Sequence, residues 1–137
     1  MRIAAILLAI AANAAPAIAS EPSDAAGEGA LLVFEQRSLQ LGVFDRDSVQ
    51  TGRFKIYNRG NEPLVIRSIF TDCGCTKAQY ERKPVEPGDS AYITVRFDGR
   101  GRAHGRIRKA VRIRSNTRDG GYSTGFVDGT ISRPTRR

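Results

Sequence analysis

A chain of 137 residues, 40% of them hydrophobic and 26% charged, is long enough for one domain with a packed core. These proportions exclude an intrinsically disordered protein, which has fewer apolar residues and a higher net charge for its size. The 22 basic residues outnumber the 14 acidic ones and give a formal net charge of +8. A partner that binds through charge is therefore expected to be anionic.

Residues 1–19 are expected to be a signal peptide. Arg2 supplies a positive charge, an apolar run follows, and Ala17-Ile18-Ala19 is a typical cleavage site. A membrane anchor is the alternative, but Asn13 and Pro16 interrupt the run, and a spanning helix requires about 20 apolar residues. We therefore expect a periplasmic or secreted protein that has no transmembrane segment after cleavage and begins with a flexible leader over residues 20–29.

From residue 30 onward, apolar residues recur with a period of two, which is typical of half-buried β-strands. No segment after the signal peptide shows a helical period. Turn residues separate short β-rich runs, which we place at 31–34, 39–43, 53–57, 64–70, 91–97, 106–114 and 122–132. About seven such strands predict an all-β fold, an immunoglobulin-like antiparallel β-sandwich over residues 30–132, with a basic tail over 133–137. A small β-barrel is the alternative.

The corner Asn58-Arg59-Gly60-Asn61 lies between two of these runs and is interpreted as a hairpin turn. In a tight turn of this kind we expect Gly60 to have a positive φ, which glycine adopts without a steric penalty. The flanking strands are expected to contribute to the core. The predicted core residues are Phe54, Ile56, Leu64, Ile66, Ile93, Val95 and Phe97.

The two cysteines, Cys73 and Cys75, flank Gly74, which would permit the bend of a small disulfide loop. Three roles stay open for this pair: a structural role in a loop, redox activity, or a two-thiolate site for a soft metal such as Cu(I). Structural zinc is disfavoured, because it requires four ligands and the chain offers these two cysteines and one distant His104. No cofactor is expected, with Cu(I) as the alternative.

No catalytic residues are predicted. His104 lies in a glycine-containing turn without an acidic neighbour to orient its ring, and a solvated loop histidine is the simpler interpretation. The chain has no nucleophile elbow, zinc-protease motif or phosphate-binding loop. Asp45, Asp47 and Asp72 are interpreted as turn-forming residues. We therefore expect a protein that is not an enzyme.

Four arginines, Arg106, Arg108, Arg112 and Arg114, occupy even positions of one predicted strand and share a face. Such a face is suited to a protein or another anionic component of the cell envelope, although it can also serve only to keep a sheet soluble and unpaired. Nucleic acid is not expected as a partner, given the export signal and the lack of an aromatic platform, since Tyr92 is the only outward aromatic of its strand.

The order of these motifs resembles the family of domain of unknown function 1573. The resemblance rests on Asn58, Gly60 and Pro63 in the corner, followed by Asp72-Cys73-Gly74-Cys75-Thr76, two proline turns and Ser115-Asn116. It implies an immunoglobulin-like domain of the hydin and major-sperm-protein type, found mainly in exported bacterial proteins. The arginine-rich segment from Arg100 to Arg114 departs from the family pattern.

These observations together predict a non-enzymatic periplasmic binding or assembly module. The alternative is a thiol-based redox or copper-handling protein that uses Cys73 and Cys75.

Overall fold

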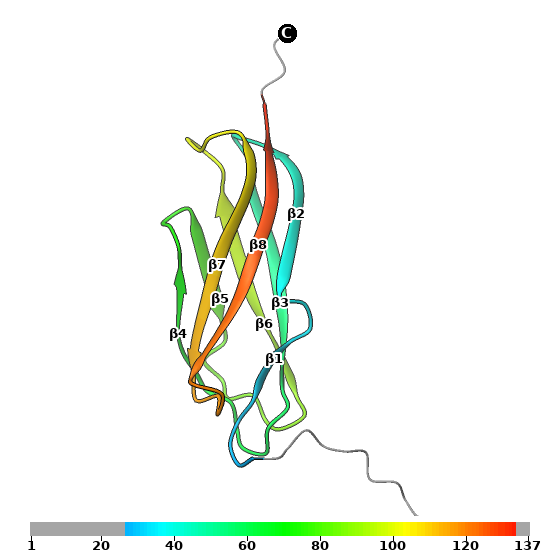
Figure 1. Ribbon diagram of the computed structural model, residues 1–137, viewed down its shortest axis with the longest axis vertical. Coiled ribbons are helices and arrows are strands. Elements are labelled where there is room, and N and C mark those ends of the chain that lie inside the picture. The colour runs from blue at the N-terminus through cyan, green and yellow to red at the C-terminus, as the bar shows by residue number, and fades with distance from the viewer. Residues whose placement is uncertain (1–26, 134–137) are drawn as a thin grey trace, which may run out of the picture.

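The computed structural model describes residues 27–133 and contains eight strands in two sheets that pack face to face (Figure 1). The predicted signal peptide, most of the leader and the tail from residue 134 lie outside these residues. The strands are β1 (Leu32–Phe34), β2 (Ser38–Asp45), β3 (Val49–Asn58), β4 (Ile66–Thr71), β5 (Thr76–Tyr80), β6 (Ser90–Asp98), β7 (Gly105–Ser115) and β8 (Tyr122–Ser132). Within residues 27–133 there is no helix that could cross a membrane.

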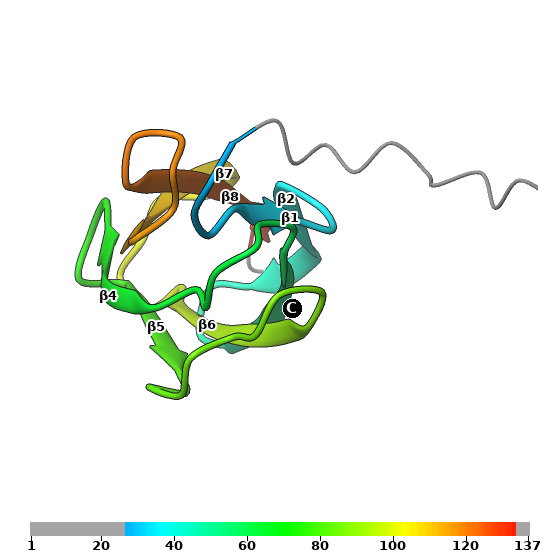
Figure 2. The same cartoon turned by 90° about the horizontal axis from the view of Figure 1, so that it is seen from below.

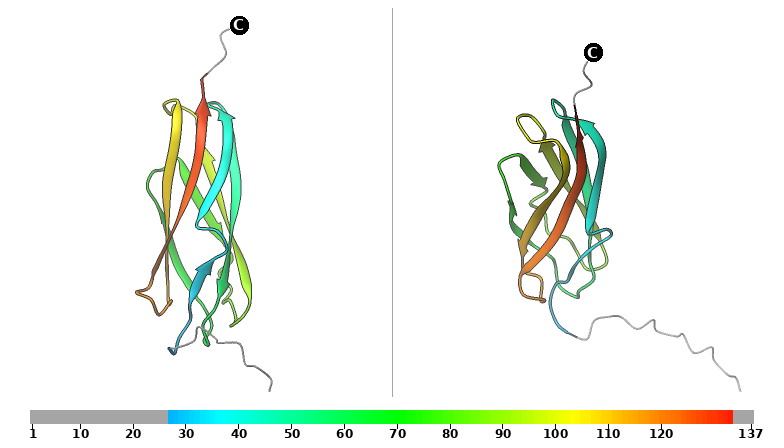
Figure 3. Two further views of the ribbon diagram at one scale, coloured as in Figure 1. Left: turned by 45° about the vertical axis from the view of Figure 1, so that its right-hand side comes forward. Right: turned by 45° about the horizontal axis from the view of Figure 1, so that its top comes forward.

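One sheet has the order β1-β3-β6-β5 and the other β2-β8-β7-β4, so the predicted β-sandwich is confirmed (Figures 2 and 3). Two details differ from the expectation. The pair β2–β8 is parallel, whereas the other strand pairs are antiparallel. In addition, β5 is a strand that the sequence patterns did not indicate.

A bulge in β2 determines which of its residues enter the core. The register between β2 and β8 shifts between Gln40 and Val43, and Gly42 has a φ of 73°, a conformation that favours glycine. As a result Val43 is 75% exposed, while the next residue, Phe44, is buried.

The predicted core is confirmed, although Ile66 is only partly buried. The main cluster fills the space between the sheets and includes Phe54, Ile56, Leu64, Ile93, Val95, Val111, Ile113 and Val127. A smaller cluster comprises Phe44, Cys75, Phe97 and Ile131. The predicted cysteine motif therefore adjoins the second cluster.

The predicted hairpin at residues 58–61 is wrong. Strand β3 pairs with β1 and β6, whereas β4 pairs with β7 in the opposite sheet, so the segment between β3 and β4 crosses from one sheet to the other. Leu64, within this crossing, is buried and forms an isolated bridge with Val85. The buried side chain of Leu64 anchors the crossing segment in the core. A tight hairpin turn would not need such an anchor.

Candidate functional site

Asn58, a motif residue of the predicted corner, is a fully buried structural junction. Its Oδ1 accepts hydrogen bonds from the backbone N–H groups of Leu31 and Gly60, at 3.2 and 3.0 Å. Its Nδ2 donates to the carbonyl oxygens of Glu62 and Val85, at 2.7 and 2.9 Å. One side chain thus joins the connections that gather at one end of the sandwich (Figure 2).

Gly60 is required for close packing and not for its φ angle. It is not among the glycines with positive φ, which corrects the expectation from the sequence. A Cβ atom at this position would lie 2.1 Å from the carbonyl oxygen of Gly29 and 2.6 Å from the backbone nitrogen of Leu31. Gly29, the last residue of the expected leader, also donates to Asn61 Oδ1 and accepts from its N–H. The backbone of residues 29–31 therefore packs directly against the corner.

Pro63 is also held in place by an asparagine. Asn116 Nδ2 donates to the carbonyl oxygen of Pro63 at 2.9 Å, and Asn116 Oδ1 accepts from the N–H of Val65 at 2.7 Å. These bonds attach the crossing segment to the end of β7. The corner residues Asn58, Gly60 and Pro63 thus have structural roles.

Cys73 and Cys75 form a disulfide, with their Cα atoms 5.2 Å apart. The loop is also fixed by noncovalent bonds. The hydroxyl of Thr71 lies 3.1 Å from the carbonyl oxygen of Cys73 and 2.8 Å from that of Thr76. The Thr76 hydroxyl is near both sulfur atoms, 3.9 Å from Cys73 Sγ and 3.7 Å from Cys75 Sγ. Asp72 accepts from the N–H of Ala110 in β7, which attaches the loop to the neighbouring strand.

The surroundings of the disulfide are asymmetric. Cys75 is buried, Cys73 is half-buried, and Gly74 between them is exposed. Apart from its chain neighbours Cys73 and Cys75, no residue has an atom within 4 Å of the position that a Cβ would take at Gly74, and its φ is not positive. Neither its φ angle nor crowding by residues outside the disulfide therefore requires a glycine there. A hollow of about 200 Å³ adjoins the loop, lined by Gly74, Cys75, Lys77, Arg96, Asp98 and Arg100.

The arginine face, defined here by Arg106, Arg108, Arg112 and Arg114, lies on the outside of the β2-β8-β7-β4 sheet. All four residues are exposed, while Ile107 is partly buried and Val111 and Ile113 are buried, so the predicted strand register is confirmed. Arg108 makes an ion pair with Asp128 at 3.5 Å and stacks over the ring of Phe126. In the described part of the chain, the guanidinium groups of the other three have no ion-pair partner.

Apolar side chains flank these arginines, which the sequence did not reveal. Phe70 is directly opposite Arg112 in the β4–β7 register, and Tyr122 is opposite Arg114 in the β7–β8 register. Phe70 is 53% exposed and Tyr122 is 55% exposed. At the other end of the face, the bulge of β2 leaves a hollow of about 370 Å³. Its lining includes Val43, Arg106, Arg108 and Asp128.

The outer face of the other sheet carries a second set of basic and aromatic residues, here called the tyrosine face: Arg53, Lys55, Tyr57, Arg59 and Tyr92. Arg53 stacks over Tyr92 at 4.7 Å, Arg59 stacks over Tyr57 at 4.7 Å, and Lys55 lies 5.2 Å from the Tyr57 ring. The sequence prediction missed this aromatic platform, because Tyr57 and Tyr92 lie on different strands that become neighbours only in the sheet.

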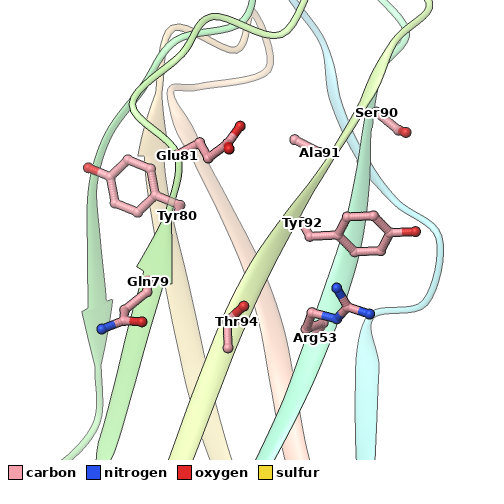
Figure 4. A pocket seen from close by; sticks show the side chains of 8 residues that line it. All are labelled: Arg53, Gln79, Tyr80, Glu81, Ser90, Ala91, Tyr92 and Thr94. Carbon is pink, nitrogen blue, oxygen red and sulfur yellow. The ribbon is translucent and has the colours of Figure 1, made fainter.

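A shallow groove of about 490 Å³ adjoins the tyrosine face where β5 ends beside β6 (Figure 4). Arg53 and Tyr92 lie on one side of it, and Tyr80 and Glu81 on the other (Figure 4). The groove is thus lined by polar and aromatic side chains and has no cluster of catalytic groups. Among residues 27–133, no three His, Cys, Asp or Glu side chains lie together as a metal site. His104 is exposed in the turn before β7.

Comparison with known proteins places the chain in a family. The family model described as "Protein of unknown function (DUF1573)" matches residues 32–127. No curated protein matches the chain.

Solved structures with similar folds come from varied proteins. A protein of unknown function from Porphyromonas gingivalis W83 is 19% identical with a TM-score of 0.65, over 82% of this chain and 51% of that one. The chain thus spans about half the length of that protein. The PapD-like domain 7 of human CEP192 is 6% identical with a TM-score of 0.60, over 98% of both chains. The YadV chaperone is 10% identical with a TM-score of 0.56, over 77% of this chain and 54% of that one. At these identities the likeness shows the fold, an immunoglobulin-like or PapD-like sandwich.

Proposed function

The chain belongs to the DUF1573 family of proteins of unknown function, and we propose that it is a non-enzymatic binding module of an exported protein that docks an acidic protein partner on its arginine face. The observation that carries this proposal is the set of exposed arginines without ion-pair partners beside exposed aromatic rings. The proposed site of action is the periplasm or the cell exterior, on the basis of the signal peptide expected from the sequence.

The charge of the arginine face favours an anionic ligand. Same-side residues two apart along a strand lie about 6.6 Å from each other, so Arg112 and Arg114 repel each other in the free protein. Of the four arginines, Arg108 alone pairs with a carboxylate among the described residues. An acidic partner would relieve this repulsion and would be attracted from a distance at low salt.

The neighbouring rings favour a protein over a lipid or a polysaccharide. Aromatic residues and arginine are enriched in protein–protein interfaces and in the residues that contribute most to their binding energy. Phe70 is opposite Arg112 and Tyr122 is opposite Arg114, so each of these two arginines has an aromatic ring beside it. The YadV chaperone, as its name states, is a chaperone with a sandwich of this fold, which agrees with a protein-binding role.

The tyrosine face is the weaker candidate for this docking. Its cations already stack on the rings of Tyr57 and Tyr92 within the molecule. A ligand would have to displace or share these contacts, whereas among residues 27–133 neither Arg112 nor Arg114 stacks on a ring.

The alternative of Cu(I) handling has less support. Thiolates, and not disulfide sulfurs, bind soft metals, and both cysteines are in the disulfide. No third ligand joins them within residues 27–133. Cu(I) binding would therefore require prior reduction and a ligand from a partner.

The test uses the purified protein to capture an envelope protein, which is then identified, purified and measured by biolayer interferometry. We expect affinity to fall steeply between about 0.01 and 0.15 M salt, as the Debye length shortens from about 30 to about 8 Å. Replacing Arg112 and Arg114 by Gln is expected to reduce affinity at least about fivefold at low salt, mainly through the association rate. The melting temperature should stay unchanged.

The matched control removes two charges from the opposite sheet, with Arg53→Gln and Lys55→Gln. Equal losses for the two double variants would mean that net charge alone governs binding, and the docking face would be wrong. A second outcome would also contradict the proposal. If no protein partner is recovered, and binding to phosphatidylglycerol vesicles weakens at least about fivefold in the Arg112→Gln and Arg114→Gln double variant, the ligand of the arginine face is a membrane surface and not a protein.

A further inference from the structure

We propose that the Cys73–Cys75 disulfide is a thiol-exchange site that accepts electrons from a negatively charged dithiol, such as an acidic protein with paired cysteines. This activity does not depend on the arginine face: the disulfide lies in the connection between β4 and β5, and the cations beside it, Lys77 and Arg96, are on β5 and β6 of the other sheet.

The two cysteines of the disulfide differ in burial. Thiol–disulfide exchange requires a thiolate to reach a disulfide sulfur, so accessibility limits the reaction. Cys73 is half-buried, whereas Cys75 is enclosed with Phe44, Phe97 and Ile131. Gly74 is exposed, and no residue other than its neighbours Cys73 and Cys75 has an atom within 4 Å of the position that a Cβ would take there. The structure thus favours attack on Cys73 Sγ from the side of Gly74.

A purely stabilising role explains this disulfide poorly. The entropy that a disulfide removes from the unfolded chain grows with the length of the loop it closes, and these cysteines are two residues apart. Hydrogen bonds from Thr71 and from the Thr76 N–H already hold the same loop. The loop can therefore keep its position when the disulfide is reduced, which is a requirement for a reversible exchange site.

The hollow beside the loop has an excess of positive charge. Arg100 hydrogen-bonds to both carboxylate oxygens of Asp98 and lowers its pKa to about 2, so these two charges neutralise each other. Lys77 and Arg96 stand directly opposite each other in the β5–β6 register. In the described part of the chain neither lies within 4 Å of a carboxylate, although Arg96 is close enough to Asp98 to contribute to its lowered pKa. Like charges in such a pair are destabilising, so this placement suggests an anionic ligand.

These two cations act on both the reactant and the product. They attract an attacking thiolate that carries additional negative charge, and they stabilise thiolates that form in the loop. The Thr76 hydroxyl, within 4 Å of each sulfur, can donate to the sulfur that becomes negative.

The reaction balances in two steps. A thiolate of the partner attacks Cys73 Sγ, forms a mixed disulfide and releases Cys75 as a thiolate, which takes up a proton. The second thiolate of the partner then attacks the partner's sulfur in the mixed disulfide. This step forms the partner's disulfide and releases Cys73 as a thiolate. The partner gains a disulfide and loses two electrons, and the cysteine pair of this chain gains them.

The experiment measures reduction of the native, oxidised protein by two small thiols of opposite charge. Mercaptoacetate carries a carboxylate and cysteamine an ammonium group. At low salt the reaction is stopped by alkylation, and intact mass counts the alkylated cysteines over time. We expect mercaptoacetate, at equal thiolate concentration, to react with the native protein faster than cysteamine.

Variants separate the contributions of charge and access. Lys77→Gln with Arg96→Gln is expected to lower the ratio of the two rates at least about fivefold, because the reagents differ by two units of charge and two cations about 8 Å away change the rate about fivefold for each unit. Arg82→Gln with Lys83→Gln removes the same two charge types from the exposed connection before β6 and should leave the ratio unchanged. Gly74→Val is expected to slow both thiols several-fold at an unchanged melting temperature, because the position has room and an ordinary φ.

Three results would overturn the proposal. Reduction that occurs only after the protein unfolds would make the disulfide a buried structural link. A ratio of rates that is the same in the wild type and in both double variants would remove the role of Lys77 and Arg96. A Gly74→Val variant that reacts as fast as the wild type would show that attack does not pass over this residue.

Discussion

Replacing Asn58 by aspartate is expected to cost more stability than its small chemical change suggests. The change keeps the shape and the two hydrogen bonds that Oδ1 accepts, but it replaces the donating Nδ2 by an oxygen. The carbonyl oxygens of Glu62 and Val85, now 2.7 and 2.9 Å from a donor, would instead face an acceptor. An unsatisfied buried polar group costs about 1–3 kcal/mol, and a buried carboxylate adds to this. We expect a total loss of about 3–5 kcal/mol, a large part of the 5–15 kcal/mol typical of a domain.

The assay is urea unfolding followed by circular dichroism, in which such a loss lowers the midpoint by about 2 M or more at an ordinary slope. Burial raises the pKa of a carboxyl group, so the folded variant binds a proton more readily than the unfolded one. The deficit should therefore shrink as the pH falls from 7 toward about 4. Asn61→Asp is the matched control, since Asn61 is exposed and its side chain only accepts a bond. If the two variants lose equal stability, Asn58 is not the junction described above.

Three further outcomes are expected. Gly60→Ala should lower the melting temperature by several degrees, because its Cβ would lie 2.1 Å from a backbone oxygen, whereas Arg59→Ala should change it little; similar shifts would refute the close packing. Phe97→Ala should cost about 3–5 kcal/mol in urea unfolding, since the ring is fully buried, and a loss below about 1 kcal/mol would contradict its place in the core. In the fold, hydrogen bonds from Arg100 lower the pKa of Asp98 from its ordinary value of 3.8 to about 2, so its stabilising contribution is present above about pH 4 and is lost toward pH 2. Asp98→Asn should remove that acid-dependent part, and identical pH profiles for variant and wild type would argue against it.

The sequence predicted those parts of the fold that depend on local patterns. Strand β6 alternates apolar and polar residues along its length, so its buried face could be assigned before any partner was known. Strand β5 escaped prediction because its one fully buried residue, Thr76, is polar, and its apolar residues, Ala78 and Tyr80, are only partly buried. The parallel pairing of β2 with β8 joins segments nearly ninety residues apart, and no short turn indicates its direction.

The candidate sites show the same division. The arginine face was predictable because its four residues lie on one strand. Its apolar neighbours Phe70 and Tyr122 come from two other strands, so they become part of the face only through the register of the sheet. The cysteine pair was evident from its spacing, but the cations beside it come from β5 and β6. The hydrogen bonds of Asn58 reach residues up to 27 positions away, and no turn motif indicates them.

The arrangement of the terminal strands also determines how the domain would respond to tension. The start of β1 and the end of β8 lie toward opposite ends of the long axis (Figure 1). Strand β8 runs along this axis between β2 and β7. Its hydrogen bonds to the antiparallel β7 are perpendicular to the strand, and those to the parallel β2 are slanted. A force that pulls the two ends apart would therefore load these bonds in shear. Many of them would have to break together, so the domain should resist extension better than one whose terminal strand can be peeled away bond by bond.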